Sequence, residues 1–381
     1  MKKRKLAILI GFMPNPRIFK RIALESQLYE VHLICWNRGD NMIPHKDNGS
    51  CVIHQIDIPA SSNPLKRLGP YRRFKKAATA FLNEIQPDVI HSQMIDMLKI
   101  AVSYAKKQPK KVRLIYEIAD LHRFLVDKQR SPVKKLVQSY LRAEDKRCCK
   151  LIDLLILTSN RYYEMYFKDF MTREKVLYFP NVPDLSAFKG YQRHNGTGSS
   201  FTVGYIGGVR YKDQCRILVE AAKRLDMPLL MAGFENGEPE IETLCRAYDK
   251  GTWVGGFDFQ TQVAGLYGQC DVIYSVYNAD MANVRVALPN KLYEAVYCGL
   301  PLIAARNTHL AEILRDWGVG SEVDHRTPDE LTELLRKMRD DHAYYDRLVQ
   351  NCAAHTEEID LERYNDALKK ILTGWHKTEG E

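Results

Sequence analysis

Short apolar runs alternate with longer amphipathic stretches along most of this chain. Such runs occupy 6–10, 31–35 and 154–158, and each is followed by a segment with helical spacing of its apolar residues. Strands of a parallel sheet that is covered on both faces have this continuous apolar character, and helices carry the chain back between them. The pattern starts again at 201–206. We therefore expect an α/β chain with two doubly wound parallel sheets.

The length of 381 residues and a hydrophobic fraction of 45% allow two domains, each with its own core. A hydrophilic stretch rich in Gly, Ser, Thr and Asn separates the two series of strands. We expect an N-terminal domain at 1–183, a linker at 184–200, a second domain at 201–355 and a C-terminal segment at 356–381.

The net charge of +9 is distributed unevenly. Residues 1–183 contain 34 Lys and Arg against 17 Asp and Glu, whereas the remainder contains 22 against 30. Within the first half, 58–83 has no acidic residue, and its cations are interleaved with Leu, Tyr and Phe. This composition favours an interfacial helix on an anionic membrane surface, although a solvated helix face has the same pattern. No motif for nucleic-acid binding accompanies it, so we expect no nucleic-acid partner.

The lengths of the apolar runs and the spacing of the cysteines exclude further classes of protein. No run approaches the 18 or more residues of a spanning helix, and the nine cysteines include no Cys-x-x-Cys pair. We therefore expect free thiols in a reducing cytoplasm, with neither a disulfide framework nor a metal site.

The segment 288–295 carries the clearest site pattern. Pro289 interrupts the preceding structure, Asn290 is a good N-cap, and the apolar residues that follow share one helical face. Lys291 and Glu294 then lie in the first turn and a half, beside free backbone N–H groups. A helix N-terminus with a lysine suits a phosphate, and a carboxylate one turn further suits sugar hydroxyls. The pattern predicts a sugar-nucleotide site, although a surface Lys-Glu pair is the alternative.

A second candidate site follows the strand at 201–206. Gly207 and Gly208 would let the backbone approach a diphosphate, and Arg210 and Lys212 on the same loop would neutralise it. The two cations could instead be ordinary surface charge.

The segment 288–295 resembles the nucleotide-binding motif of the retaining GT-B glycosyltransferases called glycosyl transferases group 1 (family 4), and in particular bacterial capsule and exopolysaccharide enzymes. The resemblance implies two Rossmann-like domains that face each other across a cleft, with the last helix packed back on the first domain. It implies that Glu294 holds the nucleotide ribose, and that Arg210 and Lys212 are displaced equivalents of a diphosphate-binding pair. The family usually has another Glu eight residues before Glu294, where this chain has Val286. The residue that orients the donor sugar is therefore open, and Asn283 and Arg285 are candidates.

Candidate residues in the first half follow its strands. Arg17 lies in the loop region after the first strand, where open α/β sheets bind ligands, and is a candidate acceptor contact or a surface arginine. The resemblance implies a His just after the strand that begins at Leu114, near the donor sugar and acceptor. That position is Ala119 here, so Asp120 and His122 beside it are the catalytic candidates. A hydrogen-bonded loop histidine is the alternative for His122.

With these features, the resemblance implies a retaining glycosyltransferase of the EC 2.4 type. It would use a nucleoside-diphosphate sugar, with no cofactor or metal, and a hydroxyl of a lipid-linked saccharide in capsule, exopolysaccharide or O-antigen synthesis. The expected location is the cytoplasmic face of the membrane. A sugar-nucleotide epimerase of the same fold and a non-catalytic partner of another glycosyltransferase are the alternatives.

Overall fold

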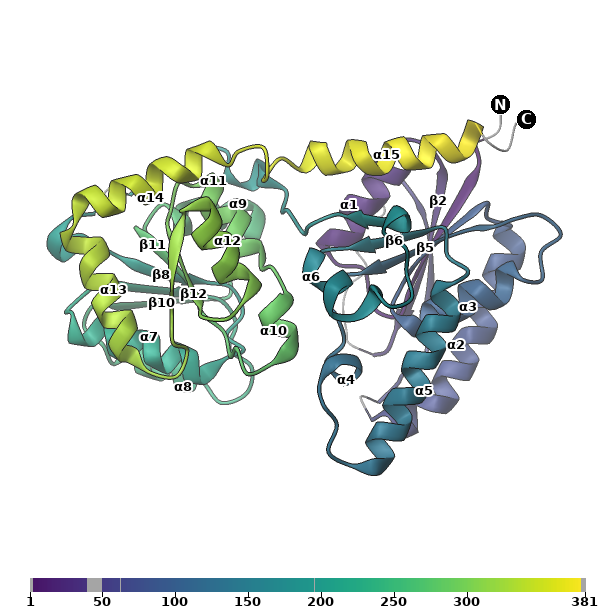
Figure 1. Ribbon diagram of the computed structural model, residues 1–381, viewed down its shortest axis with the longest axis horizontal. Coiled ribbons are helices and arrows are strands. Elements are labelled where there is room, and N and C mark those ends of the chain that lie inside the picture. Colours follow the sequence, from purple (N-terminus) through teal and green to yellow (C-terminus); the bar gives the residue numbers. More distant parts are fainter. Residues whose placement is uncertain (1–2, 40–49, 62, 195, 378–381) are drawn as a thin grey trace. The chain divides into compact units, whose positions relative to one another are not determined.

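The computed structural model describes residues 3–39, 50–61, 63–194 and 196–377, and Figure 1 shows their arrangement within each part of the chain. The residues cluster into two compact units. Unit 1 comprises Met1–Pro180 and Glu362–Glu381, and unit 2 comprises Asn181–Leu361. We describe each unit by itself.

Unit 1 is built on a parallel sheet of seven strands in the order β3-β2-β1-β4-β5-β6-β7. The order reverses between β1 and β4, so the carboxyl ends of these two strands form the topological switch point. The strands are β1 (Lys5–Ile10), β2 (Glu30–Asn37), β3 (Val52–Asp57), β4 (Val89–Gln93), β5 (Arg113–Ile118), β6 (Leu154–Leu157) and β7 (Val176–Tyr178).

Helices cover both faces of this sheet. The helices α2, α3 and α5 lie side by side, as Figure 1 shows. The C-terminal helix belongs to the same unit: its Leu368 and Leu372 are buried, and Tyr29 Oη donates to the Leu372 carbonyl at 3.4 Å. The helices of unit 1 are α1 (Pro16–Glu25), α2 (Pro64–Ile85), α3 (Ile95–Ala105), α4 (Arg123–Val126), α5 (Pro132–Cys149), α6 (Asn160–Tyr162) and α15 (Leu361–Lys377), with a π-turn at Tyr163–Phe167 and a 3-10 turn at Arg173–Lys175.

The basic segment expected to lie on a membrane forms most of α2, but its apolar side faces inward. Phe74 and Leu82 are fully buried, and the Phe74 ring stacks on Trp36 with 4.7 Å between ring centroids. Phe81 packs on His54 at the same centroid distance. These aromatic side chains therefore pack within unit 1, and contact of this segment with a membrane stays a prediction. Among the described side chains of α2, the exposed ones include its cations and Leu68, which is 56% exposed.

Unit 2 repeats the architecture with six parallel strands in the order β10-β9-β8-β11-β12-β13. Its switch point lies between β8 and β11. The strands are β8 (Val203–Ile206), β9 (Leu229–Ala232), β10 (Gly251–Gly255), β11 (Val272–Ser275), β12 (Leu302–Ala305) and β13 (Gly320–Val323). The helices are α7 (Lys212–Arg224), α8 (Glu240–Arg246), α9 (Phe259–Tyr267), α10 (Ala282–Val286), α11 (Asn290–Tyr297), α12 (His309–Trp317), α13 (Pro328–Asp340) and α14 (His342–Ala354), with 3-10 turns at Leu185–Phe188 and Gly198–Ser200.

The stretch expected to be a linker, 184–200, is an ordered part of unit 2 wherever it is described. Phe188 is buried, with its ring centroid 5.3 Å from that of Tyr267. The buried carboxylate of Asp271 accepts hydrogen bonds from the backbone N–H groups of Gly196 and Thr202. The polar composition of this stretch therefore reflects contacts with a buried carboxylate as well as with solvent.

Two doubly wound parallel sheets confirm the predicted fold class. All nine cysteines are buried free thiols. Among the described residues, no helix combines the length and the apolar character that crossing a membrane requires.

Candidate functional site

Two glycine backbones meet at the carboxyl edge of the unit 2 sheet. Gly207 follows β8 with a φ of 132°, and Gly233 follows β9 with a φ of 144°. A Cβ on Gly233 would lie 2.0 Å from the Gly207 carbonyl oxygen, so no other residue fits there without displacing the backbone. The close approach leaves an edge without side chains beside the switch point, where open α/β sheets bind ligands.

Lys291 points at this edge from the first turn of α11. Its Nζ lies 2.9 Å from the position of a Cβ on Gly207 and 3.1 Å from the Tyr277 hydroxyl. The Tyr205 ring centroid is 4.7 Å from the same ammonium. Lys291 is only 8% exposed, and in the described part of the chain no carboxylate lies within 4.0 Å of its Nζ. A buried cation that only uncharged groups surround favours binding of an anion.

Glu294 lies one turn further along α11 and is also buried. Its Oε2 accepts a 2.6 Å hydrogen bond from the Tyr267 hydroxyl. Burial and the nearby Glu294 carboxylate raise the pKa of Tyr267 well above its ordinary value, so the phenol stays protonated and donates. The carboxylate is therefore held in one orientation.

Asn290 does not cap α11 as expected. It is the first residue of the helix, and Pro289, which cannot cap with a side chain, takes the N-cap position. The Asn290 Oδ1 instead accepts a 2.6 Å hydrogen bond from Asn181 Nδ2. The helix N-terminus thus keeps backbone N–H groups without a side-chain cap, which is the arrangement that favours an anion.

The two cations of the β8–α7 loop differ in their surroundings. Lys212 is the first residue of α7, and its Nζ lies 2.7 Å from Glu235 Oε1 and donates to the Glu238 carbonyl at 2.6 Å. Arg210 is exposed, with its Nε 3.9 Å from the position of a Cβ on Gly208. Lys212 therefore serves an ion pair within the unit, while Arg210 remains at the glycine edge.

Phe234 also lies at this edge, although it was not among the residues expected there from the sequence. It follows Gly233 directly, is 72% exposed, and its ring atoms lie 2.1 to 2.8 Å from the position of a Cβ on Gly256. The ring thus rests on the bare backbone that follows β10. An exposed aromatic face beside a glycine edge is suited to stacking on a planar base. The sequence signal that could have identified Phe234 is an aromatic residue directly after the glycine that ends a strand.

The loop between β11 and α11 contains the position of the absent glutamate. Val286 occupies it as a buried apolar residue at the end of α10. Arg285 Nη1 donates to the Ala279 and Asp280 carbonyls, so its side chain holds its own loop. Asn283 has a buried Oδ1 with no hydrogen-bond partner.

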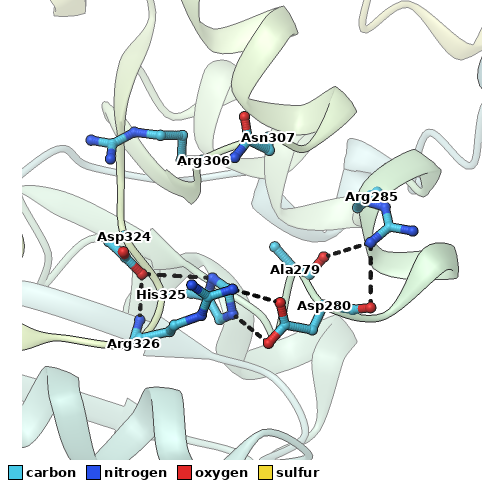
Figure 2. Close-up of a pocket in the computed structure, with 8 residues that line it drawn as sticks. All are labelled: Ala279, Asp280, Arg285, Arg306, Asn307, Asp324, His325 and Arg326. Carbon is cyan, nitrogen blue, oxygen red and sulfur yellow. Dashed lines mark hydrogen bonds and ion pairs between the residues drawn. The ribbon is translucent and has the colours of Figure 1, made fainter.

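A polar pocket of about 230 Å³ lies beside this loop (Figure 2). Asp280 forms one side and reaches Arg326 at 2.7 Å and the buried His325 at 3.6 Å. These contacts tie the loop before α10 to the segment between β13 and α13. Its lining residues are Ala279, Asp280, Arg285, Arg306, Asn307, Asp324, His325 and Arg326.

Unit 1 contains a buried charged network at the carboxyl ends of β4 and β5. His91 Nδ1 lies 2.6 Å from Glu25 Oε1, and His91 Nε2 lies 3.0 Å from Glu117 Oε2. Arg21 donates to both Glu117 oxygens, at 3.1 and 3.2 Å. Arg17 is the most exposed cation of the group, with its Nε 4.0 Å from Glu117 Oε1. The structure thus places Arg17 at a charged cluster near the unit 1 switch point.

The pKa values in this network favour charged groups. Burial alone would raise the pKa of Glu117, but Arg21 and His91 outweigh it and hold that pKa well below its usual range. With Arg17, Arg21 and a protonated His91 against two carboxylates, the network carries one net positive charge. The sequence alone does not reveal this network, because its contacts depend on strand register.

Asp120 and His122 follow β5 and are both exposed. His122 Nδ1 accepts a 3.2 Å hydrogen bond from the Phe124 backbone N–H at the start of α4. His122 is thus a hydrogen-bonded loop residue, and a role for it in the site stays a prediction. In the described part of the chain, no cluster of three or more His, Cys, Asp or Glu residues could hold a metal ion.

Comparisons with known proteins match both units. The family model described as Glycosyl transferase 4-like matches residues 19–151, and the one described as Glycosyl transferases group 1 matches residues 200–341. The succinoglycan biosynthesis protein ExoL of Rhizobium meliloti (strain 1021) is 22% identical over 343 residues, which are 85% of this chain and 82% of that protein.

Solved structures share the fold over nearly the whole chain. Sucrose-phosphate synthase from Thermosynechococcus elongatus has a TM-score of 0.73 at 16% identity and covers 98% of this chain and 100% of its own. Anabaena Alr3699/HepE in complex with UDP-glucose has a TM-score of 0.69 at 15% identity, with 97% and 99% covered.

Proposed function

Because the chain belongs to the group 1 glycosyltransferases, we propose that unit 2 binds a nucleoside-diphosphate sugar and that the enzyme transfers its sugar to a saccharide hydroxyl. The observation that carries the donor site is Lys291, a buried ammonium without a carboxylate partner in the described chain, aimed at the Gly207 edge. A diphosphate on that edge would provide the missing negative charge.

The rest of the nucleotide extends along the same edge. One turn inside α11, the oriented carboxylate of Glu294 would accept hydrogen bonds from the ribose hydroxyls. Phe234, at the other end of the edge, would stack on the base. The complex of HepE with UDP-glucose, a protein of the same fold, supports a nucleotide sugar as donor.

For the chemical step we propose transfer with retention of configuration. The leaving diphosphate would help to deprotonate the incoming hydroxyl, which then attacks the anomeric carbon from the same face. Lys291, Arg210 and the α11 N-terminus would stabilise the charge that develops on the diphosphate. These protein cations would balance that charge without a metal ion or other cofactor.

The acceptor we propose is a lipid-linked saccharide of exopolysaccharide synthesis at the cytoplasmic face of a membrane. ExoL, named for succinoglycan biosynthesis, supports the polysaccharide class. Arg17 and the positive network behind it would contact the acceptor in unit 1, with Asp120 and His122 on the same edge.

The first test is nucleotide binding by thermal shift with UDP and GDP. We expect one of them to raise the melting temperature of the wild type, and Lys291→Met to lose most of that shift. Lys223→Met, an exposed lysine of α7, is the matched control and should behave like the wild type. An unchanged shift in Lys291→Met would contradict the proposed diphosphate site.

A further inference from the structure

The outer face of α5 carries an apolar stripe that the rest of unit 1 does not cover. Val133 is 70% exposed, Leu136 73%, Val137 44% and Tyr140 57%. Their spacing of three, four and seven residues places all four on one side of the helix. A surface helix of a soluble domain normally turns such a stripe inward, so this one favours a partner.

The opposite side of α5 fixes the helix to the unit. Gln138 Nε2 donates to the Phe124 and Asp127 carbonyls, and Arg142 donates to the Leu125 carbonyl. Cys148 and Cys149 are fully buried at the C-terminal end. The stripe is therefore held outward by contacts on the other face of the same helix.

Cations surround the stripe. Between Lys128 and Ala143 there is no acidic residue, and Lys134 and Lys135 lie exposed within the stripe's first turns. Helix α2 lies beyond α3 in the same helix layer, since α2 contacts α3 and α3 contacts α5 (Figure 1), and it adds its cationic face. Both α2 and α5 start at the carboxyl edge of the sheet, so their N-terminal halves lie at the same end of this layer. The exposed cations of α2 are Lys66, Arg72, Arg73, Lys75 and Lys76.

We propose that the α5 stripe and the cationic face of α2 form one docking surface for an anionic lipid bilayer. The apolar side chains of α5 would enter the headgroup region, while the lysines beside them reach the lipid phosphates. Charge complementarity favours lipid over a second copy of this chain, because two copies would bring like charges together. This proposal rests on the proposed function, because a docking surface for a bilayer would bring the enzyme to a lipid-linked acceptor.

The test is flotation of the purified full chain with vesicles of phosphatidylcholine, with and without phosphatidylglycerol. We expect the wild type to float only with the anionic vesicles, and Leu136→Ser to bind at least about tenfold more weakly. Leu151→Ser, an exposed leucine just beyond α5, is the matched control and should float like the wild type.

A second pair of variants tests the cations. The double variant Lys134→Glu/Lys135→Glu should lose flotation, whereas Lys106→Glu/Lys107→Glu, exposed at the opposite end of the helix layer, should retain most of it. Failure of the wild type to float, or equal flotation of Leu136→Ser, would overturn the proposal. A dimer in sedimentation that Leu136→Ser dissociates would also overturn it and assign the stripe to a second copy.

Nucleotide thermal shifts measured on the same samples separate this proposal from the proposed function. We expect all these variants to keep the wild-type shift, because α5 and α3 belong to unit 1 and the donor site to unit 2. Flotation without any nucleotide shift would leave the docking surface standing and remove the donor site.

Discussion

At the scale of single residues, the position of Lys291 has the most direct bearing on function. A buried ammonium normally has a carboxylate partner, since its desolvation is costly without one. Here the Tyr205 and Tyr277 rings and one phenol hydroxyl provide the only attractive contacts given by the described residues. The positive charge of Lys291 is therefore only partly compensated by the described residues, which favours binding of an anionic ligand.

Glu294→Gln should lower sugar transfer by about 10²-fold, because a neutral amide accepts more weakly from hydroxyl donors than a carboxylate. The amide oxygen can still accept from Tyr267, so the melting temperature should change little. Initial rates with a matched acceptor would measure the effect. The control is Glu220→Gln, exposed on α7. Wild-type rates in Glu294→Gln would remove the ribose role.

Phe234→Ala should weaken nucleotide binding by roughly five- to 150-fold, which corresponds to the usual 1–3 kcal/mol for one stacked base. Because the ring is 72% exposed, its removal should leave stability nearly unchanged. Isothermal titration with the nucleotide found by thermal shift would measure this. Phe234→Trp should restore the affinity, and an affinity that is the same in all three proteins would exclude stacking.

His91 makes the stability of unit 1 depend on pH. Burial alone would lower its pKa, but Glu25 and Glu117 outweigh it and raise the pKa to about 9 from 6.5. The folded state then binds the proton more tightly than the unfolded state. The resulting stabilisation, up to about 3 kcal/mol, is complete below about pH 6.5 and is lost as the pH rises through about 9.

Urea unfolding of the wild type and of His91→Gln between about pH 6 and about pH 9 would measure this linkage. The difference in unfolding free energy between the two proteins should shrink with rising pH. His342→Gln, exposed on α14, should show no such change. A constant difference across the range would mean that the pKa of His91 is the same in the folded and unfolded states, and a difference that grows with pH would mean that His91 is neutral in the fold.

Much of the donor site could be predicted from the sequence because it lies in one short segment. Lys291 and Glu294 are three residues apart, so helical geometry alone relates them. The pairing of Lys212 with Glu235 could not be predicted in this way, because Glu235 follows a different strand. The contact of His91 with Glu117 likewise requires the register of β4 against β5.

At the scale of elements, the alternating pattern predicted both sheets. It did not predict which side of an individual helix faces the sheet. In α2, cations and apolar residues are interleaved so evenly that the sequence does not reveal which side faces the sheet. The stack of Phe74 on Trp36 shows which side of α2 faces the sheet, because Trp36 lies in β2. The stripe of α5 is clear in the sequence only once the buried Gln138 fixes the inner face.

The docking of α15 on unit 1 should be measurable as stability. Leu368→Ala should cost about 2–5 kcal/mol, because it leaves a cavity where a fully buried side chain packed. The loss should appear in the unfolding of unit 1 and not in that of unit 2, which bound nucleotide would mark by its own shift. Lys370→Ala, exposed on the same helix, is the control. Equal destabilisation of both units would contradict this assignment.

At the scale of the whole molecule, the two units differ sharply in charge. Unit 1 has 38 Lys and Arg against 21 Asp and Glu, and unit 2 has 18 against 26. The basic unit is also the one that presents the apolar stripe of α5. The proposed membrane contact and the proposed donor site therefore lie in different units, so separate measurements can test them.

The return of the chain to unit 1 has a consequence for its synthesis. Unit 2 is formed by one continuous stretch, whereas unit 1 takes its last helix from the end of the chain. A ribosome therefore synthesises all of unit 2 before it completes α15. Until α15 is made, the surface of unit 1 that Leu368 and Leu372 cover in the folded chain remains exposed. Premature termination near residue 361 would leave a complete nucleotide-binding unit joined to an unfinished partner that chaperones are expected to retain.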